Sequence, residues 1–184
     1  MTAWAGDFTY DFLRELLAAY AASGRDGSAL RQYCCGGAAV PPALIRSAQE
    51  LGIAAYRLWG MTELPTATTA CELDPLELRA ETDGTPAPGV SLRVLDDSGT
   101  PVGPGEVGEL QLRGPEMMLG YIREEFNERA FTPDGWLRTG DLGWLGTDGW
   151  VRISGRLKDI INRGGEKFST REIEQALDAH PDIQ

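Results

Sequence analysis

The chain contains 184 residues, of which 42% are hydrophobic, and its 17 basic and 28 acidic residues give a formal net charge of −11. A chain of this length can bury one large hydrophobic core and a second, smaller one. The negative charge and the lack of a basic block argue against a surface for nucleic acid or anionic membranes. An anionic ligand would therefore be held by backbone amides and a few well-placed cations.

The cysteines and the amino terminus indicate a cytoplasmic protein. Cys34, Cys35 and Cys71 match no metal-ligand spacing, so we expect reduced thiols. No apolar run approaches the roughly 18 residues of a transmembrane helix. Asp7 and Asp11 lie where a signal peptide would be apolar, so export is not expected.

Residues 1–75 predict alternating helices and strands. Apolar residues three and four apart indicate an amphipathic helix over residues 8–22, and a second helix is expected over residues 41–52. Strands are expected at residues 30–35 and 53–58. This strand-helix-strand order is typical of a parallel sheet.

After residue 75 the sequence changes to short apolar segments separated by Gly, Pro and Asp. Strands at residues 90–95 and 107–113 predict small antiparallel β structure. Three further short elements are expected: a helix at 127–131, a strand at 159–162 and a helix that begins at 169–172.

A predicted hairpin brings an acid and a base together. Asp148-Gly149 is a strong two-residue turn signal between strands expected at residues 142–146 and 150–154. Counting outward from this turn places Asp141 opposite Arg156, about 5 Å away. A carboxylate that accepts two hydrogen bonds beside a permanent cation suits a sugar diol next to a phosphate. A structural Asp-Arg ion pair explains the same spacing equally well.

Two other segments could contact a ligand. Gly36-Gly37-Ala38 lies between a strand and a helix, where a flat ligand could approach the backbone, although a tight turn is the commoner explanation. The loop over residues 59–63 follows a strand end, where open α/β sheets bind ligands. Its Glu63 could hold Mg²⁺ and its Thr62 could donate to a phosphate. A helix-capping Thr-Glu pair beside a packed Trp is the alternative.

Five segments, taken in order, resemble the later core motifs of the AMP-forming adenylating superfamily, which includes acyl-CoA synthetases, luciferases and the adenylation domains of peptide synthetases. These segments are CGGAAVP, YRLWGMTE, GELQLRG, WLRTGDLG and GRLKDIINRGGEKFSTREIE. The resemblance covers roughly residues 30–178. The last segment is most similar to bacterial medium-chain acyl-CoA and cyclohexanecarboxylate-type CoA ligases.

The resemblance implies an α/β plus β fold. Residues 1–75 would be the carboxyl-terminal part of a large, doubly wound α/β subdomain that binds adenylate. Residues 76–157 would form a small antiparallel β-barrel-like subdomain. Residues 158–184 would contain a hinge and the start of a small, mobile α+β carboxyl-terminal domain.

The resemblance also implies roles for individual residues. Thr62 and Glu63 would act in catalysis, the first by contacting phosphate and the second by binding Mg²⁺. Asp141 would accept hydrogen bonds from both ribose hydroxyls, and Arg156 would contact ribose or phosphate. The residues expected to bind ATP or AMP are Gly36, Gly37, Ala38, Trp59, Gly60, Met61, Thr62, Asp141, Ile153 and Arg156.

Two further roles concern the thioester step. Lys158 would be the hinge about which the carboxyl-terminal domain turns between acid adenylation and thioester formation. After that turn, Gly164, Gly165 and Glu166 would flank the pantetheine arm of CoA.

Two motifs of the superfamily are missing from the sequence. Nothing resembles the Ser/Thr/Gly-rich phosphate loop that would precede CGGA, and the chain ends at Gln184, before the expected catalytic lysine. We therefore expect a fragment that is inactive alone and whose partner is the amino-terminal part of the same enzyme.

The expected activity is ATP-dependent ligation of a carboxylic acid to CoA, with Mg²⁺ and an acyl-adenylate intermediate. The acid itself is not identified by the sequence. Two alternatives remain at this point: a non-catalytic nucleotide-binding or interaction module, and an adenylation domain that loads a carrier protein.

Overall fold

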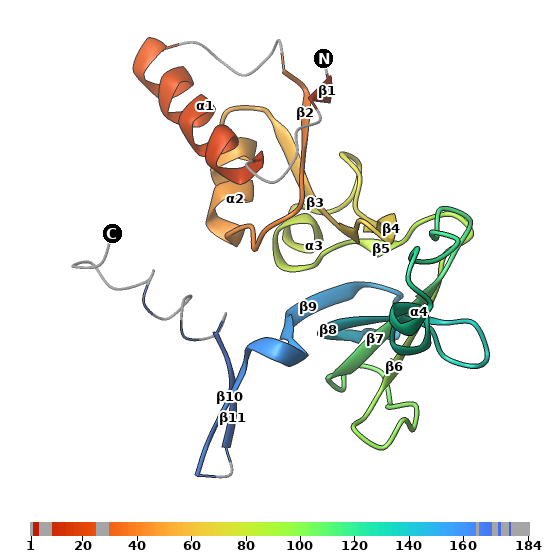
Figure 1. The fold of residues 1–184 in the computed structure, drawn as a ribbon. Helices are drawn as coiled ribbons and strands as arrows, with labels where there is room; N and C mark the ends of the chain where they lie inside the picture. Colours follow the sequence, from red (N-terminus) through yellow and green to blue (C-terminus); the bar gives the residue numbers. More distant parts are fainter. Residues whose placement is uncertain are drawn as a thin grey trace. The chain divides into compact units, whose positions relative to one another are not determined.

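The computed structural model describes residues 2–3, 9–24, 30–164, 166–170, 173 and 177 (Figure 1). They belong to two compact units. The first unit comprises Met1–Val90, Gly114–Met118 and Gly149–Val151, and the second comprises Ser91–Arg113, Leu119–Asp148 and Arg152–Gln184. Both units contain β-sheets, and the predicted mixed α/β class is confirmed. The domain boundaries expected after residues 75 and 157 stay a prediction.

The first unit is built on a five-stranded sheet with the order β1-β2-β3-β4-β5. Its strands are β1 (Thr2–Ala3), β2 (Gln32–Cys35), β3 (Ala54–Met61), β4 (Leu64–Thr69) and β5 (Thr85–Pro86). Strands β2 and β3 are parallel, as the sequence predicted, and β1, which was not predicted, is parallel to β2. Pairing from β3 to β4 and from β4 to β5 is antiparallel. The sheet is therefore mixed, and β4 and β5 were not predicted.

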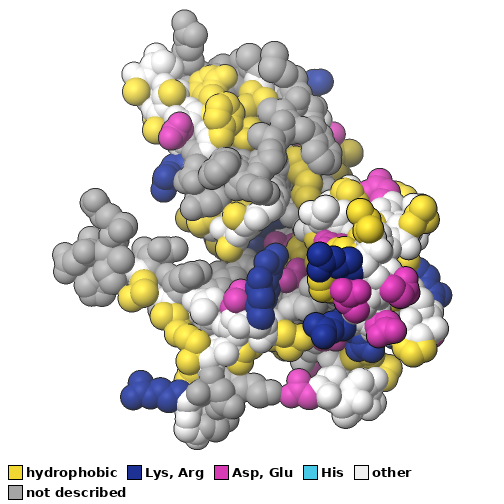
Figure 2. Space-filling view, viewed as in Figure 1, with side chains coloured by type: hydrophobic (Ala, Val, Ile, Leu, Met, Phe, Trp, Pro, Cys, Tyr) yellow, Lys and Arg dark blue, Asp and Glu magenta, His cyan; other side chains and the backbone are white. Residues whose placement is uncertain are grey.

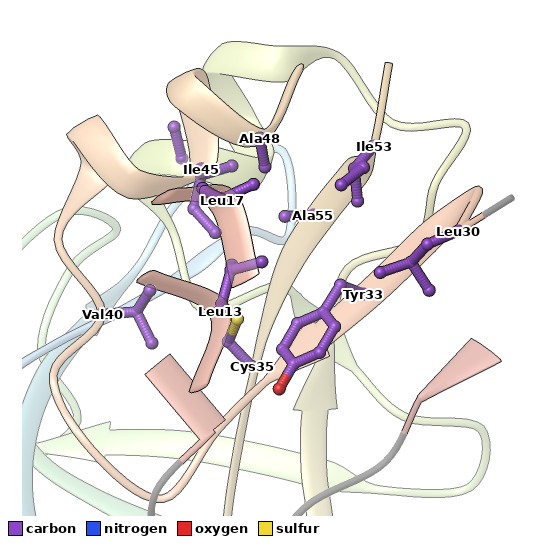
Figure 3. Packing of buried hydrophobic residues seen from close by; sticks show 11 residues of the cluster. Leu13, Leu17, Leu30, Tyr33, Cys35, Val40, Ile45, Ala48, Ile53 and Ala55 are labelled. Atoms are coloured by element: carbon purple, nitrogen blue, oxygen red, sulfur yellow. The ribbon is translucent and has the colours of Figure 1, made fainter. Parts of the chain in front are cut away.

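Three helices accompany this sheet: α1 (Thr9–Ser23), α2 (Pro42–Glu50) and α3 (Leu76–Glu81). The predicted helices correspond to α1 and α2 with shifts at their ends, whereas α3 was not predicted. Leu13 and Leu17, four residues apart on α1, are buried because they lie on the same helix face. Figure 3 shows the core that they share with β2, α2 and β3. Its buried residues are Leu13, Leu17, Leu30, Tyr33, Cys35, Val40, Ile45, Ala48, Ile53, Ala55 and Ala80.

The second unit contains a four-stranded sheet with the order β6-β7-β8-β9. Its strands are β6 (Ser91–Leu95), β7 (Gly108–Arg113), β8 (Leu137–Leu145) and β9 (Val151–Arg156), of which only Val151 is assigned to the first unit. Pairing is antiparallel from β6 to β7 and from β7 to β8, and the short turn between β8 and β9 forms the predicted hairpin. In the residues that the structure describes, β6 and β9 are edges. The sheet is open, which corrects the expected barrel-like form, because four strands are too few to close.

Shorter elements complete the second unit. They are α4 (Glu124–Ala130), the 3-10 helix η1 (Leu157–Asp159), β10 (Ile160–Arg163) and β11 (Glu166–Ser169), and β10 pairs with β11 in antiparallel fashion. Helix α4 begins three residues earlier than predicted, with Glu124 and Glu125 in its first turn. The helix expected to begin at residues 169–172 falls partly outside the described residues.

None of the described helices combines the length and the apolar character that a membrane span requires.

Candidate functional site

The loop after β2 contains two glycines with different structural requirements. A Cβ atom added to Gly36 would lie 2.9 Å from Cγ and Cδ1 of Leu58, so β3 leaves little room there. Gly37 has a φ of 79°, a left-handed conformation that favours glycine. Ala38 is exposed. Close packing against Leu58 therefore accounts for Gly36 and a left-handed turn for Gly37, and contact with a nucleotide stays a prediction.

The segment expected as a loop over residues 59–63 is mostly strand. Trp59, Gly60 and Met61 belong to β3, and the turn itself consists of Thr62 and Glu63. The pairing with β4 is irregular between Trp59 and Met61, and a Cβ atom on Gly60 would lie 2.0 Å from the carbonyl oxygen of Pro65. This irregularity is a bulge of the kind that re-aims side chains at the end of a strand.

Two polar side chains lie at the end of this hairpin. Thr62 is exposed and Glu63 is half-buried. The backbone amide of Met118 donates a hydrogen bond of 2.8 Å to the carbonyl oxygen of Glu63. Met118 follows the GELQLRG motif, and its contact with a turn more than fifty positions earlier carries no sequence signal. The turn is therefore held by two separate parts of the first unit.

Glu63 can be tested as a ligand for Mg²⁺. The described residues contain no group of three or more His, Cys, Asp or Glu side chains that could form a protein-only metal site. Mg²⁺ usually binds one or two carboxylates and takes its remaining ligands from water and substrate phosphates. A half-buried carboxylate on a braced turn fits that kind of site.

In the second unit, Asp141 on β8 and Arg156 on β9 are in contact. Nε of Arg156 donates a hydrogen bond of 3.0 Å to Oδ1 of Asp141, and the two side chains are 55% and 4% exposed. The predicted proximity of these residues is confirmed. Within the described part of the chain, the terminal amino groups of Arg156 form no further hydrogen bond or ion pair. They are available to an anionic ligand, while the carboxylate is held in a largely water-free place.

Strand β8 is irregular just before Asp141. Arg138 pairs with Gln111 and Leu142 pairs with Glu109, so three residues of β8, 139–141, lie opposite one residue of β7. Gly140 has a φ of 69°, which allows this extra length to fold out of the ladder. Counting along a regular hairpin did not predict this bulge, although Gly inside a strand pattern is a signal for one.

The positions of the remaining predicted site residues do not by themselves indicate a role. Ile153 is half-buried on β9, and Lys158 is exposed in η1. Gly164 follows β10 with a φ of 66°. Gly165 and the side chain of Glu166 lie outside the described residues, so their contact with CoA stays a prediction.

The buried cysteines do not offer a nucleophile. All three cysteines are free, and Cys34 and Cys35 are buried. Burial raises the pKa of both thiols to about 12, so they stay protonated at neutral pH and lack the reactive thiolate.

A polar pocket of about 430 Å³ lies in the second unit and was not predicted. Arg93, Gln111 and Arg138 come from three adjacent strands and lie in one cross-strand row. Four carboxylates, those of Asp96, Asp97, Glu109 and Asp134, also line it. Figure 2 shows basic and acidic side chains intermixed over this unit, without an extended basic patch in that view. Neither Asp141 nor Arg156 lines the pocket.

Comparison with known proteins identifies related chains. Residues 7–122 match the model of the AMP-binding enzyme family. The chain is 41% identical over 180 residues to the medium-chain fatty-acid–CoA ligase of Escherichia coli strain K12, an alignment that covers 97% of this chain and 31% of that protein. It is 43% identical over 148 residues to the sulfoacetate–CoA ligase of Cupriavidus necator, covering 79% of this chain and 29% of the relative.

Solved structures show the same similarity. O-succinylbenzoate coenzyme A synthetase from Bacillus subtilis, solved in complex with ATP and magnesium ion, aligns with a TM-score of 0.86 and 30% sequence identity. That alignment covers 100% of this chain and 37% of the solved one. The chain thus spans about a third of the length of the curated relatives that it matches.

Proposed function

Because this chain belongs to the AMP-binding enzyme family, we propose that it forms part of an AMP-forming acyl-CoA ligase. In the first step the carboxylate oxygen of an acid attacks the α-phosphorus of ATP, and pyrophosphate leaves. In the second step the sulfur of CoA attacks the acyl carbonyl carbon, the thiol proton is lost, and AMP leaves. The observation that carries the proposal is the nearly buried Asp141, held by Arg156 beside a strand bulge in a member of this family.

We assign Asp141 to the ribose of ATP. A carboxylate can accept hydrogen bonds from the 2′ and 3′ hydroxyls together. Because the Asp141 side chain is only 4% exposed, little water has to be removed when the sugar binds. Arg156 offsets the buried negative charge through Nε and keeps its terminal amino groups for the ribose or a phosphate.

We assign Thr62 and Glu63 to the phosphates. The exposed hydroxyl of Thr62 can donate to a phosphate oxygen, and Glu63 would hold Mg²⁺. When bound, Mg²⁺ supplies charge neutralisation of the phosphates. Local neutralisation matters here because the chain has a net charge of −11, which repels a polyanionic substrate. Gly36, Gly37, Ala38 and Trp59 would contribute to the adenine and acyl contacts.

We assign the thioester step to the segment after β9. Lys158 lies in the three-residue helix η1 between β9 and β10, and ends of elements are where hinges absorb backbone rotation. Gly164, Gly165 and Glu166 would then lie beside the pantetheine arm of CoA. The exposure of Lys158 and the positive φ of Gly164 are compatible with these roles.

Activity would require the remaining two-thirds of the enzyme. The relatives act on acids as different as medium-chain fatty acids and sulfoacetate by their names, so the acid is not transferred from them. We propose that an amino-terminal part with a phosphate loop is the partner of this chain, and that the enzyme works in the cytoplasm.

The ribose assignment is tested by replacing Asp141 with alanine in the complete enzyme. We expect Asp141→Ala to raise the KM for ATP by about 10- to 100-fold in acid-dependent pyrophosphate exchange, because two hydrogen bonds to a charged group are lost. Asp148→Ala, at the exposed tip of the same hairpin, is the matched control and should leave the KM unchanged. An unaltered KM in Asp141→Ala, with a retained fold by circular dichroism, would contradict the assignment.

A further inference from the structure

The bulge in β8 leaves backbone groups outside the regular ladder. A step of two residues on β7, from Glu109 to Gln111, faces a step of four residues on β8, from Leu142 to Arg138. The extra residues need other hydrogen-bond partners, because an unpaired backbone group in a buried sheet is costly.

One side chain supplies two of these partners. The hydroxyl of Thr139 donates a hydrogen bond of 2.6 Å to the carbonyl oxygen of Leu110. The hydroxyl oxygen of Thr139 in turn accepts a hydrogen bond of 3.0 Å from the backbone amide of Asp141. Thr139 is β-branched and half-buried, so its χ1 angle is restricted and the hydroxyl has a defined position. Asp141 is therefore tied to the neighbouring strand β7 through this hydroxyl.

The hydrogen bonds of Thr139 help to set the direction of the Asp141 carboxylate. Asp141 is held at its backbone amide by Thr139 and at its side-chain oxygen by Arg156. Gly140, between the two linked residues, has the left-handed φ of 69° and, as a glycine, does not itself restrict the backbone there. A carboxylate that must meet two adjacent hydroxyls has to be held to within about 0.5 Å.

We propose that Thr139 is a positioning residue for ribose recognition, and that its hydroxyl holds Asp141 in the orientation that meets both sugar hydroxyls. This inference deepens the proposed function and rests on the assignment of Asp141 to the ribose.

The test measures dissociation constants of the complete enzyme by calorimetry for ATP and for 2′,3′-dideoxy-ATP, which lacks both hydroxyls. Thr139→Val keeps the β-branched shape but removes the hydroxyl, and Thr139→Ser keeps the hydroxyl. We expect Thr139→Val to weaken ATP binding about 5- to 10-fold, the loss of roughly one oriented hydrogen bond, with little change for the dideoxy nucleotide. Thr139→Ser should stay within about twofold of the unaltered enzyme for both nucleotides.

Two results for Thr139→Val would overturn the inference. Equal weakening of both nucleotides by Thr139→Val would indicate general damage to the sheet, and unchanged binding of both would show that the hydroxyl has no positioning role. If Thr139→Val does not fold, Thr139→Ala replaces it, with the same expectation. Asp141→Ala separates failure of the ribose assignment from failure of the positioning role. If Asp141→Ala leaves the preference for ATP over dideoxy-ATP intact, the ribose assignment itself fails. If it abolishes that preference while Thr139→Val and Thr139→Ala do not alter it, only the positioning role fails.

Discussion

Gly60 lies where a side chain on β3 would collide with the backbone of the returning strand β4. A Cβ atom there would be 2.0 Å from the carbonyl oxygen of Pro65 and 2.6 Å from its carbonyl carbon, and backbone atoms cannot move aside as a side chain can. Gly36 differs in this respect, because its nearest neighbours at 2.9 Å belong to the side chain of Leu58. The glycine of WGMTE thus has a structural role in bringing Thr62 and Glu63 to the end of the hairpin.

We expect Gly60→Ala to lower the free energy of unfolding by about 2–3 kcal/mol, because the added methyl group forces β3 and β4 apart. Gly36→Ala, in the same unit, should cost only about 1 kcal/mol since Leu58 can change its rotamer. Urea denaturation followed by tryptophan fluorescence gives both values. Equal losses for the two variants would show that the hairpin tolerates a side chain at residue 60.

The contact between Asp141 and Arg156 could be predicted from the sequence, but the hydrogen bonds that hold Asp141 in place could not. Two strands flanking an Asp-Gly turn share a register that can be counted, so cross-strand neighbours follow from the sequence. The hydrogen bonds of Thr139 depend on a bulge against β7, a strand thirty positions earlier, and no local pattern specifies that pairing. The brace from Met118 to Glu63 was missed for the same reason.

At the scale of elements, α3 is held by a buried arginine. Arg79 is only 4% exposed and donates hydrogen bonds to the carbonyl oxygens of Asp74 and Ala55 and to Oε1 of Gln49. Burial lowers the pKa of Arg79 below its ordinary value, yet a guanidinium stays protonated. The cation therefore joins α3 to α2 and β3.

We expect Arg79→Met to lower the free energy of unfolding by about 2–4 kcal/mol, because the oxygens of Ala55 and Gln49 lose their donor inside the protein. Arg46→Met is the matched control on α2. Its guanidinium is bound to Glu77 and Glu81 in a more exposed position. Arg46→Met should therefore lower the free energy of unfolding clearly less than Arg79→Met does. Chemical denaturation measures both, and a control as damaging as Arg79→Met would contradict this account of α3.

The sequence predicted both long amphipathic helices of the first unit but missed α3 and β4. The fifteen-residue α1 and the nine-residue α2 each carry a buried apolar face, which periodicity detects. The six-residue α3 is too short for that, and the threonine-rich β4 follows a Thr-Glu turn that lacks the usual hairpin residues. As a result, residues 59–61 were expected in a loop although they belong to a strand.

At the scale of the whole molecule, the proposed reaction depends on how reactants are oriented and neutralised, and not on a protein nucleophile. The two buried thiols are protonated, and no metal-binding group of three or more side chains occurs in the described residues. Acyl transfer through an adenylate needs neutralised phosphates and oriented reactants more than a protein nucleophile. The nearly buried carboxylate of Asp141 and the terminal amino groups of Arg156 are suited to orienting and neutralising such a substrate. The carboxylate of Glu63, on a turn held by Met118, is suited to the same purpose.

The central claim is that this chain belongs to an enzyme that activates a carboxylic acid with ATP. The most direct measurement is exchange of labelled pyrophosphate into ATP by the complete enzyme, with and without aliphatic, aromatic and sulfonated carboxylic acids. We predict exchange that depends on at least one acid, and release of AMP with a CoA thioester once CoA is added. Nucleotide binding without acid-dependent exchange, or release of ADP in place of AMP, would contradict the account.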